Sequence, residues 1–331
     1  MTTMKTPHPS LGNLAALALL AVPLQASEPI QPYLESGKSG RFNYAVYNKV
    51  WIQASLQEGD SKTTSRVAIT GVIPEADGGV VIPPSIGDHE VYGIDGGSLE
   101  ADPRIRTVSI PKTVRFLQPS VLNRWPSLEY IDIADDHPDF ASVDGVMFDK
   151  RKTTLLAYPG GRRGEYKFPA STTAIGPGAF AMNQNLTSLA IPAGVTDIGG
   201  HKGGVFEGCR NLERVEIPDS VTYIGQQSFK NCSRLQEIAI PPKVTEIPFG
   251  LFWGCGSLTR VALPDGITGI GNYAFAGCAK LRLPRLPAGL TTIGAFAFRD
   301  CVGLNGLKVP ESVTDIARGA FQGCEVEIPG Q

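Results

Sequence analysis

Aromatic, thiol and proline positions recur at a fixed spacing along the carboxyl-terminal half of the chain. Each of the six cysteines follows a phenylalanine by three residues, and successive pairs are 23 residues apart. The pairs consist of Phe206, Phe229, Phe252, Phe275, Phe298 and Phe321 with Cys209, Cys232, Cys255, Cys278, Cys301 and Cys324. Phe180 precedes this row by 26 residues, and apolar-Pro pairs recur with steps of 23 and 26 residues from Phe168-Pro169 onward. A fixed period over this length indicates a repeat protein built from stacked units.

One repeat unit, IPDSVTYIGQQSFKNCSRLQEIA, begins at Ile217, and the next begins at Ile240. The end of the unit has the pattern Leu235-x-x-Ile238-x-Ile240, whose last apolar residues are two apart, and this predicts a short β-strand. Pro241 ends that strand because proline cannot donate a hydrogen bond to a neighbouring strand. The rest of the unit has room only for a turn or a single helical turn. Such a unit buries too little apolar surface to fold alone, so we expect the units to stack as coils of a parallel β-solenoid, with strands about 4.8 Å apart.

These units resemble the BspA-type leucine-rich repeats of bacterial and protist surface proteins. The family's motif is present as IGNYAFAGC at residues 270–278 and as CSRLQEIAIP at residues 232–241. The resemblance covers nearly all of the chain after residue 26. It implies a leucine-rich-repeat solenoid whose coils have strands on the concave side and short turns or single helical turns on the convex side. Members of the family are implicated in adhesion to host or matrix proteins, in contact between cells and in engaging immune receptors.

Two segments outside the regular units complete the predicted architecture. Residues 27–100 resemble the family's amino-terminal β cap and a first degenerate coil, and residues 101–331 are expected to form the solenoid. A degenerate coil from Ile110-Pro111 has Leu122 at the Phe position and Trp125 at the Cys position. Two strand-like runs flank the polar residues 149–152 and predict an inserted β-hairpin from Phe140 to Pro159, within about residues 134–167. We interpret this hairpin as a structural decoration, and a binding element is the alternative.

The first 26 residues have the pattern of a signal peptide. Lys5 supplies a weak positive charge, residues 14–22 form an apolar run, and Ala26 is a small residue at a plausible cleavage site. The run is too short to span a bilayer, and no other segment approaches that length. Cleavage would give a secreted, periplasmic or cell-surface protein without a membrane span, whereas a disordered apolar tail or an uncleaved anchor are the alternatives. Residues 328–331 contain no sorting motif, so release or non-covalent retention is expected.

Composition and charge narrow the class of protein further. Of the 331 residues, 30 are Lys or Arg and 32 are Asp or Glu, and the resulting charge of −2 gives no field that would attract nucleic acid. The 38 glycines and 26 prolines indicate frequent turns and argue against long helices. We therefore expect a folded, helix-poor monomer that does not bind nucleic acid.

The sequence contains no catalytic motif. Nothing in it places a nucleophile and a carboxylate beside any of the three histidines after the leader, His89, His137 and His201. The segment DDHPD at residues 135–139 is the best candidate for calcium binding, but it lacks the spacing and the turn glycine of a calcium loop. We interpret it as a solvated turn. Zinc, serine-hydrolase and phosphate-loop signatures are absent from the sequence, so we expect no enzyme activity, no cofactor and no metal.

Six cysteines in an exported chain would ordinarily suggest three disulfides. Here all six occupy one equivalent position, at which the unit beginning at Phe168 has Asn183. Cysteine and asparagine are small polar residues that can serve backbone donors where a coil turns, and a free thiol also packs as a small apolar group. A straight row of thiols does not form the tetrahedron that zinc requires. We expect a structural ladder of reduced, buried thiols, with a functional role as the alternative.

The outward strand positions are the candidate ligand-binding surface. A stacked sheet forms a broad platform on the concave side, and its outward residues change from acidic or mixed to basic towards the carboxyl end. The candidates are Tyr130, Arg214, Glu237, Arg260, Arg282, Arg285 and Lys308. Leu283 is also expected to point outward. Pro284 departs from the pattern because it stands at an inward apolar position and removes a hydrogen-bond donor, so it is expected to disturb the strand of that coil.

These features favour an exported, non-catalytic recognition or adhesion module that binds a protein or a glycan on its concave sheet. The basic end of the sheet favours an acidic partner. The alternative is a structural cell-envelope protein without a defined ligand, in which the same charges only solvate the surface.

Overall fold

The computed structural model describes residues 33–47, 66–95, 99–164 and 166–327, which form one compact unit. The predicted signal peptide, part of the predicted cap and residues 328–331 lie outside the described residues.

Short β-strands make up nearly all of the regular structure. The amino-terminal strands are β1 (Tyr33–Ser39), β2 (Phe42–Tyr47), β3 (Arg66–Val72), β4 (Gly79–Val81), β5 (Ser85–Ile86), β6 (His89–Ile94), β7 (Thr107–Ile110), β8 (Phe116–Leu117), β9 (Tyr130–Ile133), β10 (Phe140–Val143), β11 (Val146–Asp149) and β12 (Thr154–Ala157). The repeat strands are β13 (Ala174–Ile175), β14 (Ser188–Ala190), β15 (Asp197–Ile198), β16 (Arg214–Glu216), β17 (Tyr223–Ile224), β18 (Glu237–Ala239), β19 (Glu246–Ile247), β20 (Arg260–Ala262), β21 (Gly269–Ile270), β22 (Thr292–Ile293), β23 (Leu307–Lys308), β24 (Asp315–Ile316) and β25 (Val326–Glu327). The helical segments within the described ranges are two 3₁₀ turns, η1 (Pro119–Arg124) and η2 (Val302–Leu304), and no helix there is long and apolar enough to cross a membrane.

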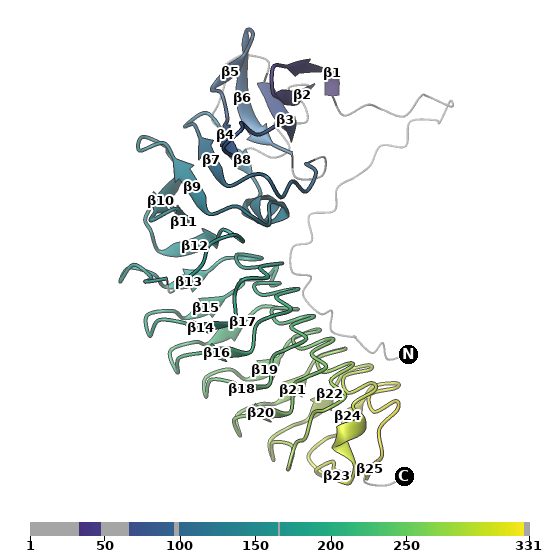
Figure 1. Cartoon of the computed structure of the whole chain (residues 1–331). Helices are drawn as coiled ribbons and strands as arrows, with labels where there is room; N and C mark the ends of the chain where they lie inside the picture. Colours follow the sequence, from purple (N-terminus) through teal and green to yellow (C-terminus); the bar gives the residue numbers. More distant parts are fainter. Residues whose placement is uncertain (1–32, 48–65, 96–98, 165, 328–331) are drawn as a thin grey trace, which may run out of the picture. The chain divides into compact units, whose positions relative to one another are not determined.

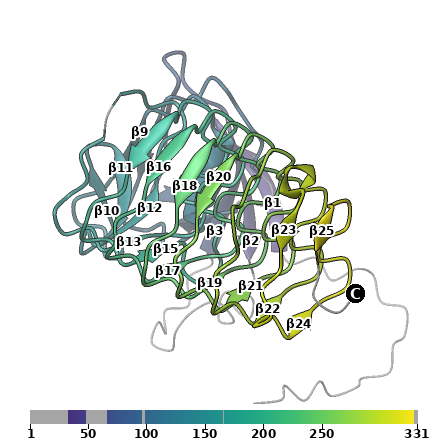
Figure 2. The same ribbon diagram turned by 90° about the horizontal axis from the view of Figure 1, so that it is seen from below.

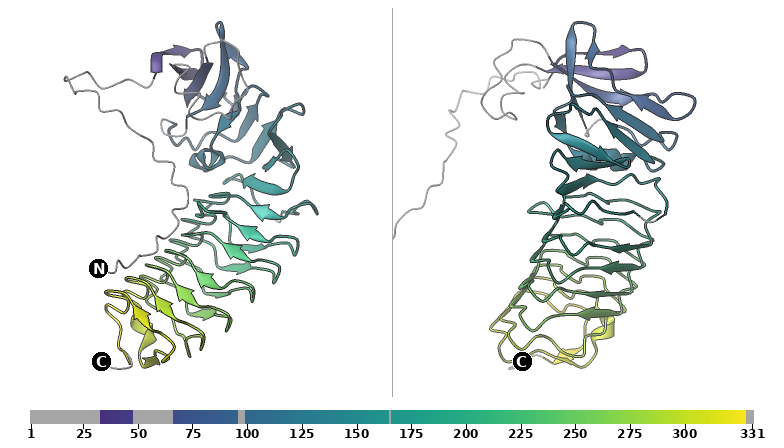
Figure 3. Two further views of the ribbon diagram at one scale, coloured as in Figure 1. Left: turned by 180° about the vertical axis from the view of Figure 1, so that it is seen from behind. Right: turned by 90° about the vertical axis from the view of Figure 1, so that its left-hand side faces the viewer.

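The repeat strands stack in parallel and form a β-solenoid of about 11 turns (Figures 1 and 3). Equivalent residues of successive coils pair with one another, as Glu237 of β18 does with Arg260 of β20. The strands lie in two rows on different sides of the coils (Figure 2). One row, which we call the strand face, contains β14, β16, β18 and β20; the other contains β13, β15 and β17, followed by β19, β21, β22 and β24. This parallel register confirms the predicted fold class.

The amino-terminal part has a different strand arrangement. Strands β1, β2 and β3 pair antiparallel, and β6 pairs with β3 in parallel. Strands β4, β7 and β9 form a separate parallel sheet, in which Thr107 pairs with Tyr130, 23 residues further on. Leu122 and Trp125 are buried next to η1, at the Phe and Cys positions of the degenerate coil. The parallel stacking of short strands is therefore present upstream of the regular repeats.

The segment predicted to hold a two-stranded hairpin contains three strands. Strand β11 is antiparallel to both β10 and β12. The additional strand arises because Asp144 and Gly145 both have positive φ, at 50° and 74°, and reverse the chain between the paired residues Val143 and Val146. An Asp-Gly pair is favoured in two-residue hairpin turns for this reason. Strand β12 then pairs in parallel with β13, so the insertion is continuous with the second row of solenoid strands.

One aromatic ring from each repeat coil stacks in the core. The stack begins at Tyr158, continues through Phe180 and the six phenylalanines of the 23-residue row, and has ring centroids 4.9–5.5 Å apart. The rings from Phe180 to Phe298 have no exposed surface. Burial of a phenylalanine side chain contributes about 2–3 kcal/mol, so the stack is a major source of stability for the solenoid.

Pro284 interrupts the strand face after β20. Leu283 is only 8% exposed and belongs to the core, whereas Pro284 is exposed. The outward orientation predicted for Leu283 and the inward position predicted for Pro284 are therefore both wrong. Pro284 has no N–H group with which to continue the ladder beyond Val261, so this coil forms no strand next to β20. Leu283 occupies the core position at which Pro284 was expected.

Candidate interaction surface

The strand face presents exposed side chains in register. In β16, β18 and β20 the central residue is buried and its two neighbours are exposed. Ser188, Arg214, Glu237 and Arg260 form one row across the sheet, because each is paired with the next in the parallel register. The structure thus brings three of the candidate residues together on neighbouring strands above a packed core.

Ion pairs divide the candidate basic residues into two groups. Three of them are paired with carboxylates: Arg214 with Glu216 at 3.0 Å, Arg285 with Asp265 at 2.8 Å and Lys308 with Glu327 at 3.3 Å. Arg260 and Arg282 are exposed, and neither has an ion pair within the described residues. The basic surface predicted from the sequence is therefore reduced to two unpaired guanidinium groups on successive coils.

Four of the candidates lie outside the sheet of β14 to β20: Arg282 and Arg285 belong to no strand, and Tyr130 and Lys308 belong to other sheets. Tyr130 is in β9, which belongs to the sheet of β4, β7 and β9, and its ring packs over the turn between β10 and β11. A Cβ added to Gly145 in that turn would lie 2.4 Å from the ring. Lys308 is in β23, which pairs only with β25 among the described strands. The structure thus does not join Tyr130 and Lys308 to the row that contains Arg260.

The six cysteines form a row inside the coils. Each thiol donates a hydrogen bond to the carbonyl oxygen of the core phenylalanine in the preceding coil, with Sγ–O distances of 2.9–3.2 Å. The sequence predicts the same role for cysteine and asparagine, but in this row only Asn183 accepts backbone N–H groups, those of Asn185 and Leu186. Five of the thiols are buried, whereas Cys324 is partly exposed, and all six are free of disulfides.

We expect the native protein to present one reactive thiol, Cys324, and the denatured protein to present six. Burial raises the pKa of Cys209 and Cys255 to about 12, so these thiols stay protonated and inaccessible. The neighbouring Cys301 side chain lowers the pKa of Cys324, and Cys324 is also the thiol that is partly exposed. Titration with a disulfide reagent at mildly alkaline pH measures both numbers, and Cys324→Ser should remove the native signal. Absence of free thiols after denaturation without reductant would contradict the assignment.

An aromatic cluster that was not predicted from the sequence lies on a third side of the coils. On this side the chain runs from a strand of the second row to the core phenylalanine and beyond it. We call this side the turn face; it comprises residues 224–234, 247–257, 270–280, 293–303 and 316–324. Trp253, Tyr273 and Phe296 stack there with centroids 5.2 Å apart in both contacts, and Phe249 packs perpendicular to Tyr273. Trp253 is 36% exposed and Phe249 37%. These residues occupy variable positions of the repeat, so a search for the fixed residues of the motif does not identify them.

Hydrogen bonds and ion pairs hold the candidate calcium segment in place. His137 is buried, which corrects its interpretation as part of a solvated turn. Its Nε2 is 3.0 Å from the Val114 carbonyl oxygen, and its Nδ1 accepts the N–H groups of Asp139 and Phe140. Burial lowers the pKa of His137, which favours the neutral ring. Among the described residues, no group of three metal-ligating side chains is placed to hold an ion.

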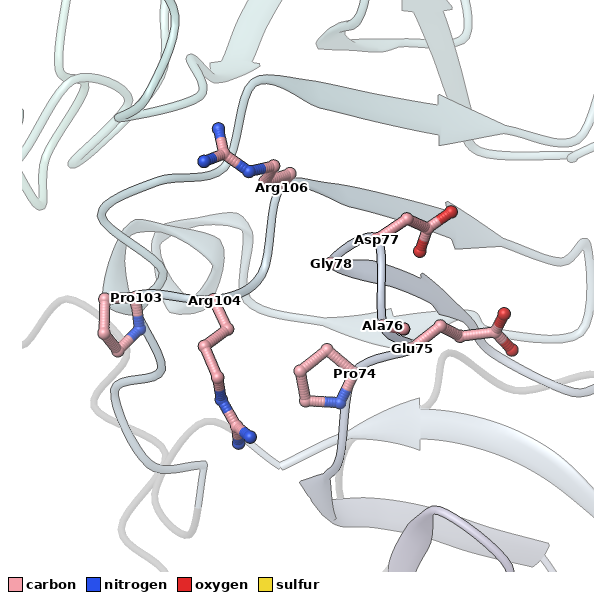
Figure 4. Close-up of a pocket in the computed structure, with 8 residues that line it drawn as sticks. All are labelled: Pro74, Glu75, Ala76, Asp77, Gly78, Pro103, Arg104 and Arg106. Carbon is pink, nitrogen blue, oxygen red and sulfur yellow. The ribbon is translucent and has the colours of Figure 1, made fainter.

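A shallow depression of about 520 Å³ lies in the amino-terminal part, between residues 74–78 and the chain before β7 (Figure 4). The two arginines that line it are engaged by carboxylates, Arg104 by Asp102 and Arg106 by Glu129. The Asp77 carboxylate accepts the N–H of Gly79. Both arginines and Asp77 are thus engaged within the chain, and the depression is a weaker candidate site than the strand face.

Comparisons with known proteins agree with this architecture. A search of curated proteins finds no match. Among solved structures, a leucine-rich repeat protein from Eubacterium ventriosum is 29% identical to this chain and superposes with a TM-score of 0.61. The match covers 67% of this chain and 60% of that protein's length. A leucine rich cell surface protein from Faecalibacterium prausnitzii is 19% identical with a TM-score of 0.31, covering 93% of this chain and 97% of that protein. Residues 164–279 and 201–327 match the BspA type leucine rich repeat region in six copies, and through these residues the chain belongs to the BspA-type leucine-rich repeat family.

Proposed function

We propose that the chain is an exported recognition module that binds a protein or a glycan through its strand face and through Arg282 in the coil that follows β20. The supporting observation is that Arg260 and Arg282 are exposed on successive coils without ion pairs among the described residues. A guanidinium fork matches the geometry of carboxylate and sulfate groups. A partner that carries such groups therefore fits this surface best.

The packing below the two arginines favours binding. Val261 and Leu281, which are neighbours of Arg260 and Arg282 in sequence, are buried in the solenoid core. The backbone of Arg282 is also tied to the preceding coil by a 3.0 Å hydrogen bond to Thr259. A surface that is already ordered loses little conformational entropy on binding.

We further propose that residues 1–26 direct export and are removed, which would place the protein at the cell surface, in the periplasm or outside the cell. The apolar run of residues 14–22 and membership of the family support this proposal. We retain residues 27–100 as the cap with a first degenerate coil and residues 101–331 as the solenoid.

The test uses the full chain produced with its leader and recovered from the exported fraction, where mass spectrometry should find Ser27 as the first residue. Binding is then measured to heparin, a sulfated glycan, and to polyglutamate. Replacing Arg260 and Arg282 together by serine should weaken the affinity about tenfold for each arginine, since a hydrogen bond to a charged group contributes about 1.5–3 kcal/mol. Added salt should also weaken the binding, because these groups are exposed.

Arg285→Ser is the matched control for this test. Arg285 lies in the same coil as Arg282, but its guanidinium is 2.8 Å from the Asp265 carboxylate, so its loss should change the affinity little. Equal affinity of the wild type, the double variant and the control for both probes would contradict the proposal. That result would favour a structural envelope protein without a defined ligand.

A further inference from the structure

The turn face carries a marked excess of positive charge. Its basic residues are Lys230, Arg234, Lys280, Arg299 and Arg318, and its one acidic residue is Asp300, although the whole chain has a charge of −2. Lys230 pairs with Glu207 of the preceding coil at 2.9 Å, and Arg299 pairs with Asp300 at 3.2 Å. Such partly exposed pairs contribute little to stability, so a partner's carboxylates can replace these acids at low cost.

The aromatic cluster presents ring edges to the solvent instead of ring faces. Tyr273 is covered on both faces, by Trp253 and by Phe296. The other face of Trp253 has the Lys230 ammonium 5.2 Å from its centroid. Phe296 has the Arg299 guanidinium 5.9 Å from its centroid and packs so closely on the next coil that a Cβ added there, at Gly319, would lie 2.5 Å from its ring. The surface that is left for a ligand consists of ring edges between two cations.

The backbone conformation shows that glycine suits these positions better than aromatic residues do. Tyr273 and Phe296 both have φ of 56°, in the left-handed region that side chains with a Cβ avoid. The equivalent positions of the adjoining coils are Gly250 and Gly319, with φ of 58° and 69°. Two bulky aromatic residues in this conformation are a source of strain, and such strain concentrates at functional sites.

We propose that the turn face around Trp253, Tyr273 and Phe296 docks a protein segment that carries carboxylates on either side of an exposed aromatic side chain. The partner's ring lies face-on against the ring edges, a perpendicular packing like that of Phe249 and Tyr273. Its carboxylates lie beside Lys230 and Arg299, at the two ends of the row. Aromatic and arginine side chains in one patch also match the composition of energetically dominant contacts in protein interfaces more closely than that of a solvated surface.

A glycan fits this surface less well than a protein does. Sugar rings pack their C–H groups on open aromatic faces, and the faces of the three stacked rings are covered by one another, by the two cations and by the next coil. The site is also distinct from the strand face, since none of its residues lies in β14, β16, β18 or β20. The two proposals can therefore be tested independently.

The experiment compares three fluorescent probes on the full chain: a random copolymer of glutamate and tyrosine, polyglutamate and heparin. The wild type should bind the copolymer about tenfold more tightly than polyglutamate, since aromatic contacts at the centre of an interface are among the strongest. Replacing Tyr273 and Phe296 together by glycine should abolish that difference. Glycine is the residue of the adjoining coils at this position, so the variant should fold, and thermal unfolding checks that it does.

Matched controls separate the aromatic cluster from general charge and from exposed aromatic residues elsewhere. Arg299→Gln introduces the residue found at the equivalent position 322 and should weaken copolymer binding, whereas Phe116→Ser, at an exposed ring in β8, should not. Arg260→Ser with Arg282→Ser should leave the copolymer's advantage over polyglutamate intact.

Two results would overturn the proposal. If the glycine variant melts at a lower temperature but still binds the copolymer more tightly than polyglutamate, the cluster is only structural. If it loses heparin binding as strongly as copolymer binding, the surface recognises a sulfated glycan and not a protein segment.

Discussion

Phe252→Ala should lower the free energy of unfolding by about 3–5 kcal/mol, the range observed when a fully buried phenylalanine is deleted. The Phe252 ring has no exposed surface and stacks between Phe229 and Phe275, at 5.5 and 5.4 Å. Its removal leaves a cavity between two coils that are fixed by backbone hydrogen bonds on both sides, so the neighbours cannot collapse into the space. Urea unfolding followed by circular dichroism measures the loss.

The adjacent residue provides the control for this substitution. Trp253 is larger than Phe252 but lies on the turn face, where it is 36% exposed and contacts Tyr273 and Lys230. Trp253→Ala should therefore cost about 1 kcal/mol, because it removes one stacked contact and one cation–π contact. Similar losses for the two variants would contradict the assignment of the phenylalanine row to the core.

The loss at Phe252 should also depend on its place in the stack. In a solenoid each coil contacts only its two neighbours, so stability is a sum of local terms and interfaces between coils. Phe321 is 8% exposed, and within the part of the chain that the structure describes its ring contacts only that of Phe298, whereas Phe252 has a ring on each side. Damage in the middle of the row affects two interfaces and is for that reason the more sensitive test.

The structural features that could be predicted from the sequence are those whose residues recur at the same position in several repeats. The spacing of Phe229, Phe252 and Phe275 identifies one inward position, and the six successive ring contacts from Phe180 to Phe321 follow from it. The contact of Phe180 with Tyr158 does not, because Tyr158 lies outside the row. The disturbance at Pro284 was also predictable, since a missing N–H group has the same consequence in any parallel ladder. The inward orientation of Leu283 could not be predicted from the sequence, because it depends on the space that is left in the core.

The candidate site was less predictable because ion pairs do not follow the repeat. Arg282 and Arg285 are three residues apart and were grouped together, yet only Arg285 has a carboxylate within reach, from Asp265 in the preceding coil. The sequence shows both charges but not which side chains can meet. The same limit applies to the thiols, whose donation to a carbonyl oxygen of the preceding coil depends on the depth at which the coils pack.

The sequence does contain a pattern that indicates the aromatic cluster. At the position of Gly250 and Gly319, the chain has Tyr273 and Phe296, so an aromatic residue replaces glycine twice in succession. A position that has glycine in some repeats and an aromatic residue in others is not restricted by packing in the core. Comparison of the repeats at polar and glycine positions, and not only at apolar ones, would have identified it.

The loop GGHKGG at residues 199–204 lies in the coil that is 26 instead of 23 residues long. The sequence predicts a bulged surface loop here, and His201 and Lys202 are indeed exposed. Gly203, however, is buried, donates its N–H to Gly199 at 2.8 Å and accepts the N–H of Gly178 at 3.0 Å. The three additional residues are thus anchored to the preceding coil through the backbone of one glycine.

Gly203→Ala should destabilise the protein by at least about 3 kcal/mol, whereas Gly200→Ala should cost about 1 kcal/mol. Both glycines have positive φ, at 64° and 47°, so both substitutions carry the penalty of a left-handed alanine. A Cβ at Gly203 would in addition lie 1.8 Å from the Gln226 carbonyl oxygen, a backbone atom that cannot move without displacing the next coil, whereas a Cβ at Gly200 meets nothing within 4 Å. Urea unfolding of the two variants isolates this close approach, and equal losses would show that the loop can move away from the following coil.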